Sequence, residues 1–136
     1  MAIIKMEQSN KSGYKILNIT IPKTIFEYEE VSQNDVAISL HLSTTHHKNN
    51  NLLIFDLKAE LTLKVAEKSV GNIMIIVRGN FEKFGDSELL FDDFVTVNAP
   101  AILYPYLREH ITSLSIKAGL SAIVLEPMNF AALIKR

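Results

Sequence analysis

The sequence predicts an α+β domain in which an antiparallel sheet, covered on one side, is followed by helices. Two patterns carry this prediction. Apolar and polar residues alternate in successive runs up to about residue 84, and apolar residues recur at helical spacing after residue 98. The chain has 136 residues, enough for one core and too few for two, so we expect a single domain over residues 1–136.

The clearest predicted strand spans residues 55–65, where apolar and polar side chains alternate without a break. The same alternation occurs over residues 17–21 and 36–42, and residues 73 to about 84 form a further run. A period of two places one face of a strand against a core and the other in water. Successive runs with short connections favour antiparallel pairing, so we expect an antiparallel sheet with one wet face.

Three segments between these runs have the composition of connections. Pro22 lacks an amide donor, so residues 25–31 are expected to be either a crossover or a continuation at a sheet edge. Residues 44–51 are rich in Thr, His and Asn and are the clearest predicted loop. Gly71 and Asn72 provide turn chemistry ahead of the run that starts at residue 73.

A long helix is predicted after the sheet. Asn98 is a natural N-cap, Pro100 fits the first turn, Pro105 should kink the helix or delay its regular part, and Gly119 is well placed at its C-terminal end. Asn129 can cap a final short helix that reaches residue 136. The apolar stripe at helical spacing consists of Leu103, Leu107, His110, Ile111, Leu114 and Ala118.

Histidines are the residues that would most readily suggest a metal site or a catalytic base. His46 and His47 are adjacent, so on a strand they would point opposite ways, and no carboxylate lies close in sequence. We expect them to lie in a solvated loop. His110 lies on the apolar stripe without an accompanying nucleophile, so a hydrogen-bonded packing histidine is favoured over a base or a ligand.

Charge and composition exclude several classes of partner. The formal net charge of −1 gives no long-range attraction to phosphate backbones, so nucleic acid is not an expected partner. Cysteine is absent, which excludes disulfides and fits a reducing compartment. The wholly apolar run over residues 73–77 is too short to span a bilayer, and the first residues lack the apolar region of a secretory signal. We expect a cytoplasmic protein without membrane insertion.

The last third of the chain resembles the SecB-like protein-export chaperones. The resemblance rests on Ala-Pro-Ala-Ile-Leu-Tyr-Pro-Tyr-Leu-Arg-Glu-His-Ile-Thr-Ser-Leu over residues 99–114, the glycine after it, and the spaced Leu-x-Pro-x-Asn-Phe-x-x-Leu over residues 125–133. Gly79-x-Phe81 extends it more loosely into the preceding strands. The resemblance implies a four-stranded antiparallel sheet with a long C-terminal helix and a short terminal helix on one face, assembled as a dimer of dimers. It also implies that unfolded clients are held without nucleotide hydrolysis.

Candidate binding residues follow from this resemblance and from the apolar pattern. A holdase needs exposed apolar grooves, and the candidate client-binding residues are Phe26, Tyr28, Leu120, Met128 and Phe130. The alternative is that each is a core or subunit-interface residue, because Met and aromatic side chains usually pack. Apolar residues off the main helical stripe predict a dimer or tetramer, with the candidate interface formed by Ile102, Tyr104, Tyr106 and Ile116.

One departure from the family pattern concerns the SecA translocase motor, which the export chaperones dock through acidic residues on the sheet. The strand before Gly79 reads Ile-Met-Ile-Ile-Val over residues 73–77, without an acid. This departure argues against docking to the motor. Asp56, Glu60 and Glu82 are candidates for a replacement acidic surface, although on alternating strands they are first of all solvent-facing residues.

Two functions of different classes are therefore predicted. The first is an ATP-independent holdase that keeps exported precursors, or one unstable partner such as a toxin–antitoxin protein, unfolded. The alternative is a non-secretory binding or scaffold protein on the same fold. The sequence has no phosphate loop, no catalytic triad candidate and no metal cluster, so we expect neither an enzyme nor a cofactor.

Overall fold

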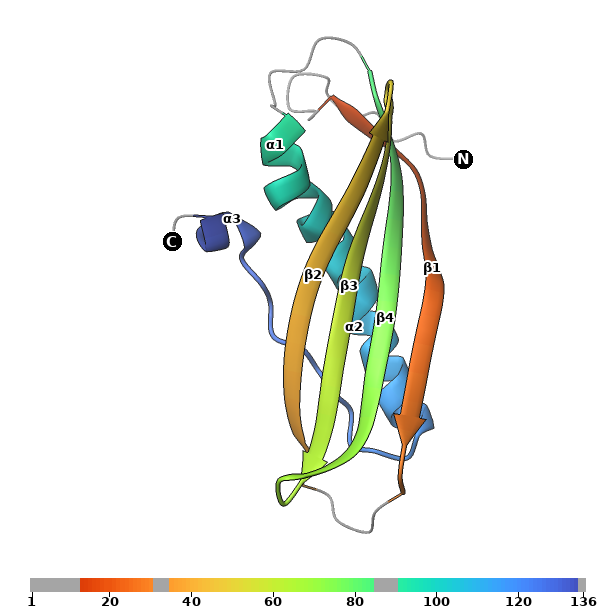
Figure 1. Cartoon of the computed structure of the whole chain (residues 1–136), viewed down its shortest axis with the longest axis vertical. Helices are drawn as coiled ribbons and strands as arrows, with labels where there is room; N and C mark the ends of the chain where they lie inside the picture. Colours follow the sequence, from red (N-terminus) through yellow and green to blue (C-terminus); the bar gives the residue numbers. More distant parts are fainter. Residues whose placement is uncertain (1–12, 31–34, 85–90, 135–136) are drawn as a thin grey trace, which may run out of the picture.

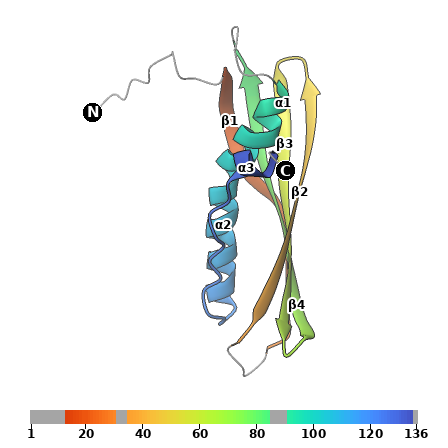
Figure 2. The same ribbon diagram turned by 90° about the vertical axis from the view of Figure 1, so that its left-hand side faces the viewer.

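The structure is a computed structural model that describes residues 13–30, 35–84 and 91–134. A four-stranded antiparallel sheet forms one layer, with strand order β1-β4-β3-β2, and a long helix forms the other (Figure 1). Viewed from the side, α2 runs along one face of the sheet and the opposite face carries no helix in the described part of the chain (Figure 2). The predicted α+β fold is confirmed. Its elements are β1 (Tyr14–Tyr28), β2 (Ala37–Asn49), β3 (Leu52–Val65), β4 (Lys68–Lys83), α1 (Phe91–Asp93), η2 (Phe94–Asn98), α2 (Ala99–Lys117) and α3 (Phe130–Ile134).

The core lies between α2 and the two central strands. Every second side chain of β3 and β4 is buried, as the period of two predicts, and three leucine or isoleucine side chains of α2 meet them. Leu103, Leu107 and Ile111 are fully buried, and each such side chain stabilises the fold by about 1.5–3 kcal/mol. A Cβ at Gly79 would lie 2.6 Å from the Phe81 ring, so the Gly-x-Phe pattern lets that ring and α2 pack closely on the sheet.

The first edge strand contains the segment whose path the sequence left open. Residues 25–28 continue β1, so the edge continuation is correct and the crossover is wrong. The pairing of β1 with β4 shifts register between Ile16 and Asn18 and again between Thr20 and Lys23. Pro22 lies in the second shift, where an edge strand tolerates a missing amide donor. The predicted end of this segment at residue 31 lies outside the described residues.

The predicted loop over residues 44–51 is wrong. Strand β2 continues to Asn49, and only Asn50 and Asn51 form the turn to β3. Asn50 has φ 55°, a conformation that asparagine tolerates and that tight hairpins require. The end of β2 beyond residue 43 is exposed on both faces, so no apolar alternation marks it as a strand.

The turn predicted at Gly71 and Asn72 is also misplaced. The hairpin from β3 to β4 turns at Ala66 and Glu67, which have φ 50° and φ 65°. Gly71 lies inside β4, where a Cβ would stand 2.5 Å from the backbone oxygen of Glu27 on β1. The glycine therefore permits the close approach of two strands and does not form a turn.

The long helix begins earlier than its predicted cap. Asn98 has helical angles, φ −73° and ψ −48°, and its side chain caps no amide, because the chain is already helical from Phe91. The turns over Phe94–Asn98 are wider than an α-helix, and the Ala99 N–H donates to the Phe94 carbonyl. Because Asn98 lies inside the helical segment and its side chain caps no amide, the predicted N-cap at Asn98 is wrong. The wide segment ends shortly before Pro100, which has no N–H to donate.

The far end of α2 agrees with the prediction. The helix continues through Pro105 to Lys117, and Gly119 follows with φ 81°. The Gly119 N–H donates to the Ile116 carbonyl and the Leu120 N–H donates to the Ser115 carbonyl, each at 3.0 Å, which is the Schellman arrangement. Since the left-handed residue ends the helix sharply, the chain turns back beside α2.

The short terminal helix also has its predicted cap. The Ala132 N–H donates to Oδ1 of Asn129 at 3.1 Å, ahead of α3. Helix α3 is described to Ile134, and the predicted end at residue 136 lies outside the described residues. None of the helices within residues 13–30, 35–84 and 91–134 combines the length and hydropathy needed to cross a bilayer.

Candidate functional site

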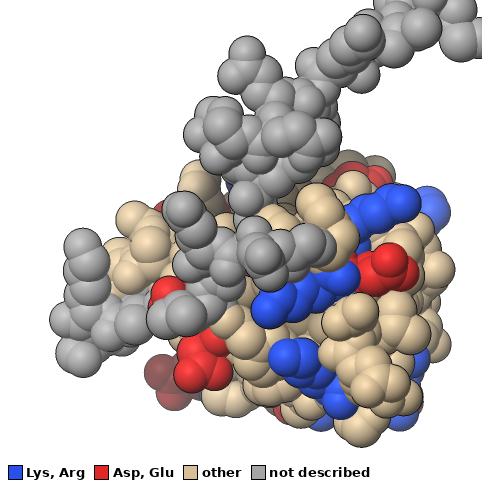
Figure 3. All heavy atoms as spheres, turned by 90° about the horizontal axis from the view of Figure 1, so that it is seen from above, with Lys and Arg blue, Asp and Glu red and all other residues tan. Residues whose placement is uncertain are grey.

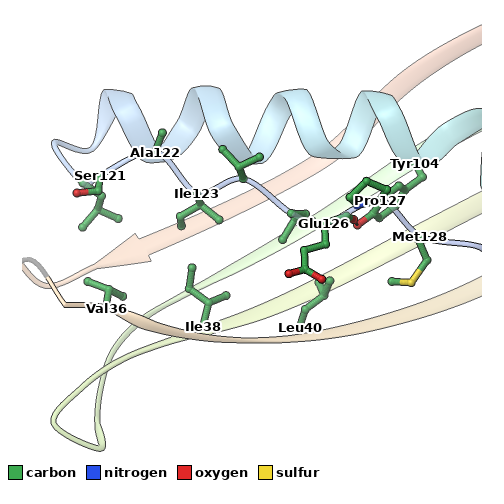
Figure 4. Close-up of a pocket in the computed structure, with 13 residues that line it drawn as sticks. Val36, Ile38, Leu40, Tyr104, Ser121, Ala122, Ile123, Glu126, Pro127 and Met128 are labelled. Atoms are coloured by element: carbon green, nitrogen blue, oxygen red, sulfur yellow. The ribbon is translucent and has the colours of Figure 1, made fainter.

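A groove of about 620 Å³ lies between β2 and the segment that connects α2 to α3. Figure 4 shows Val36, Ile38 and Leu40 extending from the sheet side toward this segment, which passes over them with Ala122, Ile123 and Met128. Most of the wall is apolar, and Glu126 is the charged side chain that borders it. The residues that line the groove are Val36, Ile38, Leu40, Tyr104, Leu120, Ser121, Ala122, Ile123, Val124, Leu125, Glu126, Pro127 and Met128.

Polar side chains of α2 hold the connecting segment in place. Thr112 Oγ1 donates to the Ile123 carbonyl at 2.6 Å, and Arg108 Nε donates to the Leu125 carbonyl at 2.8 Å. The fully buried Ser115 Oγ accepts the Ile123 N–H at 2.9 Å and donates to the Thr112 carbonyl at 2.8 Å. Positions one helical turn apart face the same way, so Arg108, Thr112 and Ser115 form a polar row along α2. This polar row provides hydrogen-bond partners for the backbone of the connecting segment. This row fixes the wall of the groove.

Tyr104 completes the row at the end of the groove. Its hydroxyl donates to the Glu126 carbonyl at 2.6 Å, and its ring meets Phe130 edge-on with the centroids 5.6 Å apart. Burial raises the pKa of Tyr104, because the phenolate would be poorly solvated there. Arg108 lies 6.0 Å from the ring centroid. Tyr104 is 4% exposed within this chain, so it supports the groove from inside and does not form part of an exposed interface.

The five candidate client-binding residues do not form one site. Leu120 and Met128 line the groove, while the mostly buried Phe130 packs against Tyr104 and lines a second hollow of about 380 Å³. Phe26 and Tyr28 lie on β1 and line a separate hollow of about 330 Å³ beside the end of α2. The sequence did not identify Ile38 and Leu40 of β2 as groove residues. Alternating apolar residues of a strand are equally expected to lie in the core.

The exposed side chains of α2 form a surface on the outer side of the helix, which adjoins the groove at Val124. Tyr106 is 50% exposed and Ile116 is 58% exposed, while Ile102 is half-buried. Ile116 lies beside Val124 in a shallow hollow on the outer side of the helix. These three candidate interface residues therefore stay available to another chain, unlike Tyr104.

The helix-free face of the sheet carries paired charges. Arg78 donates to both carboxylate oxygens of Asp56 at 2.8 and 2.9 Å, and this hydrogen bonding raises the pKa of Arg78. Lys58 Nζ lies 3.2 Å from a carboxylate oxygen of Glu60. Two of the three candidate acids thus have basic partners. At the end of the molecule seen in Figure 3, uncharged residues cover most of the visible described surface, with both signs of charge present.

Three of the four histidines occupy different settings. His46 lies on the helix side of β2 with its ring edge-on to Phe91, and the adjacent His47 lines a hollow on the helix-free face. His110 Nε2 lies 3.0 Å from Thr24 Oγ1 in an exposed hydrogen bond. This confirms the hydrogen bond predicted for His110, whose side chain is only half-buried. Within the described ranges, no cluster of three or more His, Cys, Asp or Glu side chains could hold a metal ion.

A groove with apolar walls, framed by a sheet edge and an extended segment, is the kind of site that binds another polypeptide. The family described as preprotein translocase subunit SecB has a sequence model that matches residues 14–136. The chain therefore belongs to the SecB family, and the predicted SecB-like chaperone class is confirmed.

Two relatives give the same assignment, and a solved structure shows the same fold. The chain is 30% identical to the protein-export protein SecB of Nitrosospira multiformis over 119 residues, covering 88% of this chain and 74% of the relative. It is 28% identical to that of Methylobacillus flagellatus, covering 88% and 75%. A Mycobacterium tuberculosis SecB-like chaperone, solved in complex with a ChAD peptide from the HigA1 antitoxin, has the same fold, with a TM-score of 0.76 at 15% identity over 85% of this chain and 91% of that one.

Proposed function

We propose that this protein is an ATP-independent holdase that keeps client polypeptides unfolded by binding apolar segments in the groove beside β2. The observation that carries the proposal is the groove itself, about 620 Å³ with mainly apolar walls. A pocket of this kind recognises side chains by burial, and burial needs no nucleotide. The cytoplasm is the proposed compartment, because a chain without cysteine needs no oxidising environment to fold.

Two equally exposed isoleucines provide the test, because Ile38 and Ile25 are each 39% exposed and lie on opposite edge strands. Ile38 lines the groove, whereas Ile25 pairs with Met74 on the helix-free face. We expect Ile38→Glu to weaken suppression of the aggregation of a chemically denatured client about tenfold, because a carboxylate would be buried by the client. Ile25→Glu should suppress aggregation as the unaltered protein does, without added nucleotide. Equal losses in both variants would contradict a groove-based holdase.

The role in export is a separate question from the holdase activity. Relatives named protein-export proteins support handling of exported precursors. The pairing of Asp56 with Arg78 and of Glu60 with Lys58 leaves Glu82 as the one of the three candidate acids without an ion pair among the described residues. This pairing favours the second candidate, a non-secretory chaperone dedicated to one partner, such as an antitoxin of the kind bound by the M. tuberculosis chaperone.

Measured affinity for the SecA motor separates the two roles. Binding of SecA to the purified protein at micromolar concentration would support export. Suppression of aggregation without such binding would support a dedicated chaperone. In both cases the groove variant Ile38→Glu should still lose client binding.

Self-association is proposed as well. The outer side of α2 exposes Tyr106 and Ile116, and Val124 of the connecting segment lies beside Ile116. These are apolar side chains that a second copy would cover. We expect a dimer or a dimer of dimers by light scattering at micromolar concentration. The double variant Tyr106→Lys with Ile116→Lys should lower the mass, and a monomeric mass for the unaltered protein would contradict the proposal.

A further inference from the structure

We propose that self-association and client binding are coupled through the connecting segment between α2 and α3, which separates the two surfaces. A second copy of the chain, seated on the outer side of α2, strengthens the binding of a client in the groove. This coupling rests on the proposed holdase function and adds the regulation of its site. It follows from three features: the position of the connecting segment between two hollows, the way α2 holds it, and the chemistry of the outer hollow.

The connecting segment runs alongside α2 as a single layer of chain (Figure 4). Its side chains alternate in exposure: Ile123 and Leu125 are buried, while Val124 between them is 66% exposed. Val124 lines the groove beside β2, and it also lines the hollow of about 550 Å³ on the outer side of α2. A molecule that touches Val124 from outside therefore contacts the same wall that a client contacts from inside.

Two residues of the outer hollow also hold this wall in place. Arg108 lines the hollow and donates to the Leu125 carbonyl at 2.8 Å. Thr112 lines it as well and donates to the Ile123 carbonyl at 2.6 Å. These hydrogen bonds fix the backbone of the connecting segment from the α2 side, while the Val124 side chain faces solvent. A partner that covers Val124 would hold the segment from its second side.

The outer hollow fits a second copy of the chain. Ile116 and Val124 give it an exposed apolar surface, and Tyr106 extends this surface along α2. Arg108 and Glu109 border the hollow with opposite charges. A contact between two identical patches must be complementary to itself, and this balance of charge allows that without an excess of like charges. A strongly acidic or basic partner would instead oppose one of the two charges.

The coupling is positive because a docked copy orders the wall before the client arrives. A client that binds a single copy must also immobilise the connecting segment, at a cost in conformational entropy. In the assembled protein the second copy has already immobilised it. Coupling between two sites is reciprocal, so the client strengthens self-association by the same factor. Such factors are typically about 5–150, and we expect about tenfold.

Hydrogen exchange followed by NMR reports on the wall without any client. The Ile123 N–H donates to Ser115 Oγ at 2.9 Å, so its exchange rate measures how firmly the connecting segment is held. We expect this exchange to slow as the protein concentration rises through the range in which the mass increases. In Ile116→Lys it should stay fast at every concentration. An exchange rate of Ile123 that does not change with the mass would overturn the coupling.

Client affinity is measured by fluorescence anisotropy with a labelled peptide of leucine, threonine and lysine, titrated with the full chain held at fixed concentrations. Ile116 lines the outer hollow and not the groove, so Ile116→Lys acts on the groove only through assembly. Where the unaltered protein is assembled, we expect the variant to bind the peptide about tenfold more weakly. In dilute solution the two proteins should bind it equally. Ile25→Lys, on the helix-free face, is the control and should match the unaltered protein throughout.

Sedimentation velocity with and without saturating peptide completes the test, and the peptide should tighten self-association by the same factor. Peptide affinity that is independent of assembly would overturn the coupling and leave the holdase in place, as would a monomeric unaltered protein. Dissociation of the assembly by the peptide would also overturn it, since client and second copy would then compete for the outer hollow. Absence of peptide binding at every concentration would overturn the holdase and the coupling with it. The concentration series of the unaltered protein gives this result even if Ile116→Lys fails to fold.

Discussion

The sheet ends on one side in β1 and on the other in β2, and the two edges differ in almost every feature that controls strand pairing. Strand β1 contains Pro22 and two register shifts, whereas β2 pairs with β3 without interruption and has no proline. Strand β2 also borders the apolar groove, while β1 packs close to β4 at Gly71. An irregular edge resists further pairing. The comparison indicates that the β2 edge, beside the groove, is better suited to pair with another chain than the β1 edge is.

Gly71→Val should have the largest effect, because it would force β1 away from β4. A Cβ at this position would lie 2.5 Å from the Glu27 backbone oxygen, which cannot rotate away as a side chain could. We expect the free energy of unfolding, measured by urea denaturation, to fall by about 3 kcal/mol. Gly119→Ala is the control, since φ 81° is strained for alanine but no atom lies within 4 Å, and about 1 kcal/mol is expected. Similar losses would mean that β1 is not held tightly at this point.

Ser115→Ala should loosen the groove on the β2 side by a somewhat smaller amount. The variant leaves the buried Ile123 N–H without the acceptor that now lies 2.9 Å away. An orphaned buried donor costs about 1–3 kcal/mol, and the connecting segment should lose its position over the groove. The free energy of unfolding, measured by urea denaturation, and the affinity for clients should therefore both fall. Ser113→Ala, on the outer side of α2, is the control and should change neither quantity. If Ser115→Ala binds clients with unaltered affinity, the position of the connecting segment does not affect client binding.

Pro22→Thr tests whether proline blocks the β1 edge. Threonine restores an amide donor in an exposed strand, so stability should change by less than about 1 kcal/mol while self-association increases with concentration. Sedimentation velocity over a concentration series measures the association. The same exchange at Pro127, outside the sheet, is the control. If Pro22→Thr sediments as the unaltered protein does, the register shifts alone are enough to block the edge.

Alkaline pH should have the smallest effect. Burial raises the pKa of Tyr104 above its ordinary value of 10.0, so the unfolded chain ionises first. The protonated Tyr104 side chain stabilises the folded state below about pH 10, and this stabilisation is lost as the pH rises through the raised pKa of Tyr104 in the folded state. Burial raises the pKa of Tyr14 as well, so Tyr104→Phe should reduce the loss without abolishing it. Urea midpoints measured on either side of pH 10 check this expectation. If the urea midpoint of Tyr104→Phe falls with pH as steeply as that of the unaltered protein, Tyr104 does not cause the loss of stability.

The covered half of the molecule could be predicted from sequence more fully than the exposed half. Alternation identified β3 because its two faces meet core and water, and Gly119 marked the end of α2 because a left-handed residue was required there. The far end of β2 was missed because neither face is buried, so its polar residues have the composition of a loop. The cap at Asn98 was misplaced because Phe94 and its neighbours extend the helix as a wider turn.

The groove was only partly predictable for a related reason. Leu120 and Met128 were found through the family pattern, whereas Ile38 and Leu40 belong to the groove only because β2 happens to be an edge strand. Strand order is a property of the whole fold and is absent from local alternation. The polar row was also missed, although Arg108 and Thr112 are one helical turn apart on α2 and could have suggested a face that binds backbone.

Site-specific crosslinking tests the central claim, that the client lies beside β2, most directly. The chain has no cysteine, so a single photoreactive label can be attached through Ile38→Cys in the groove or through the equally exposed Ile25→Cys on β1. The groove account predicts that a denatured client crosslinks strongly from position 38 and at background level from position 25. Equal crosslinking from both positions, or stronger crosslinking from position 25, would contradict it.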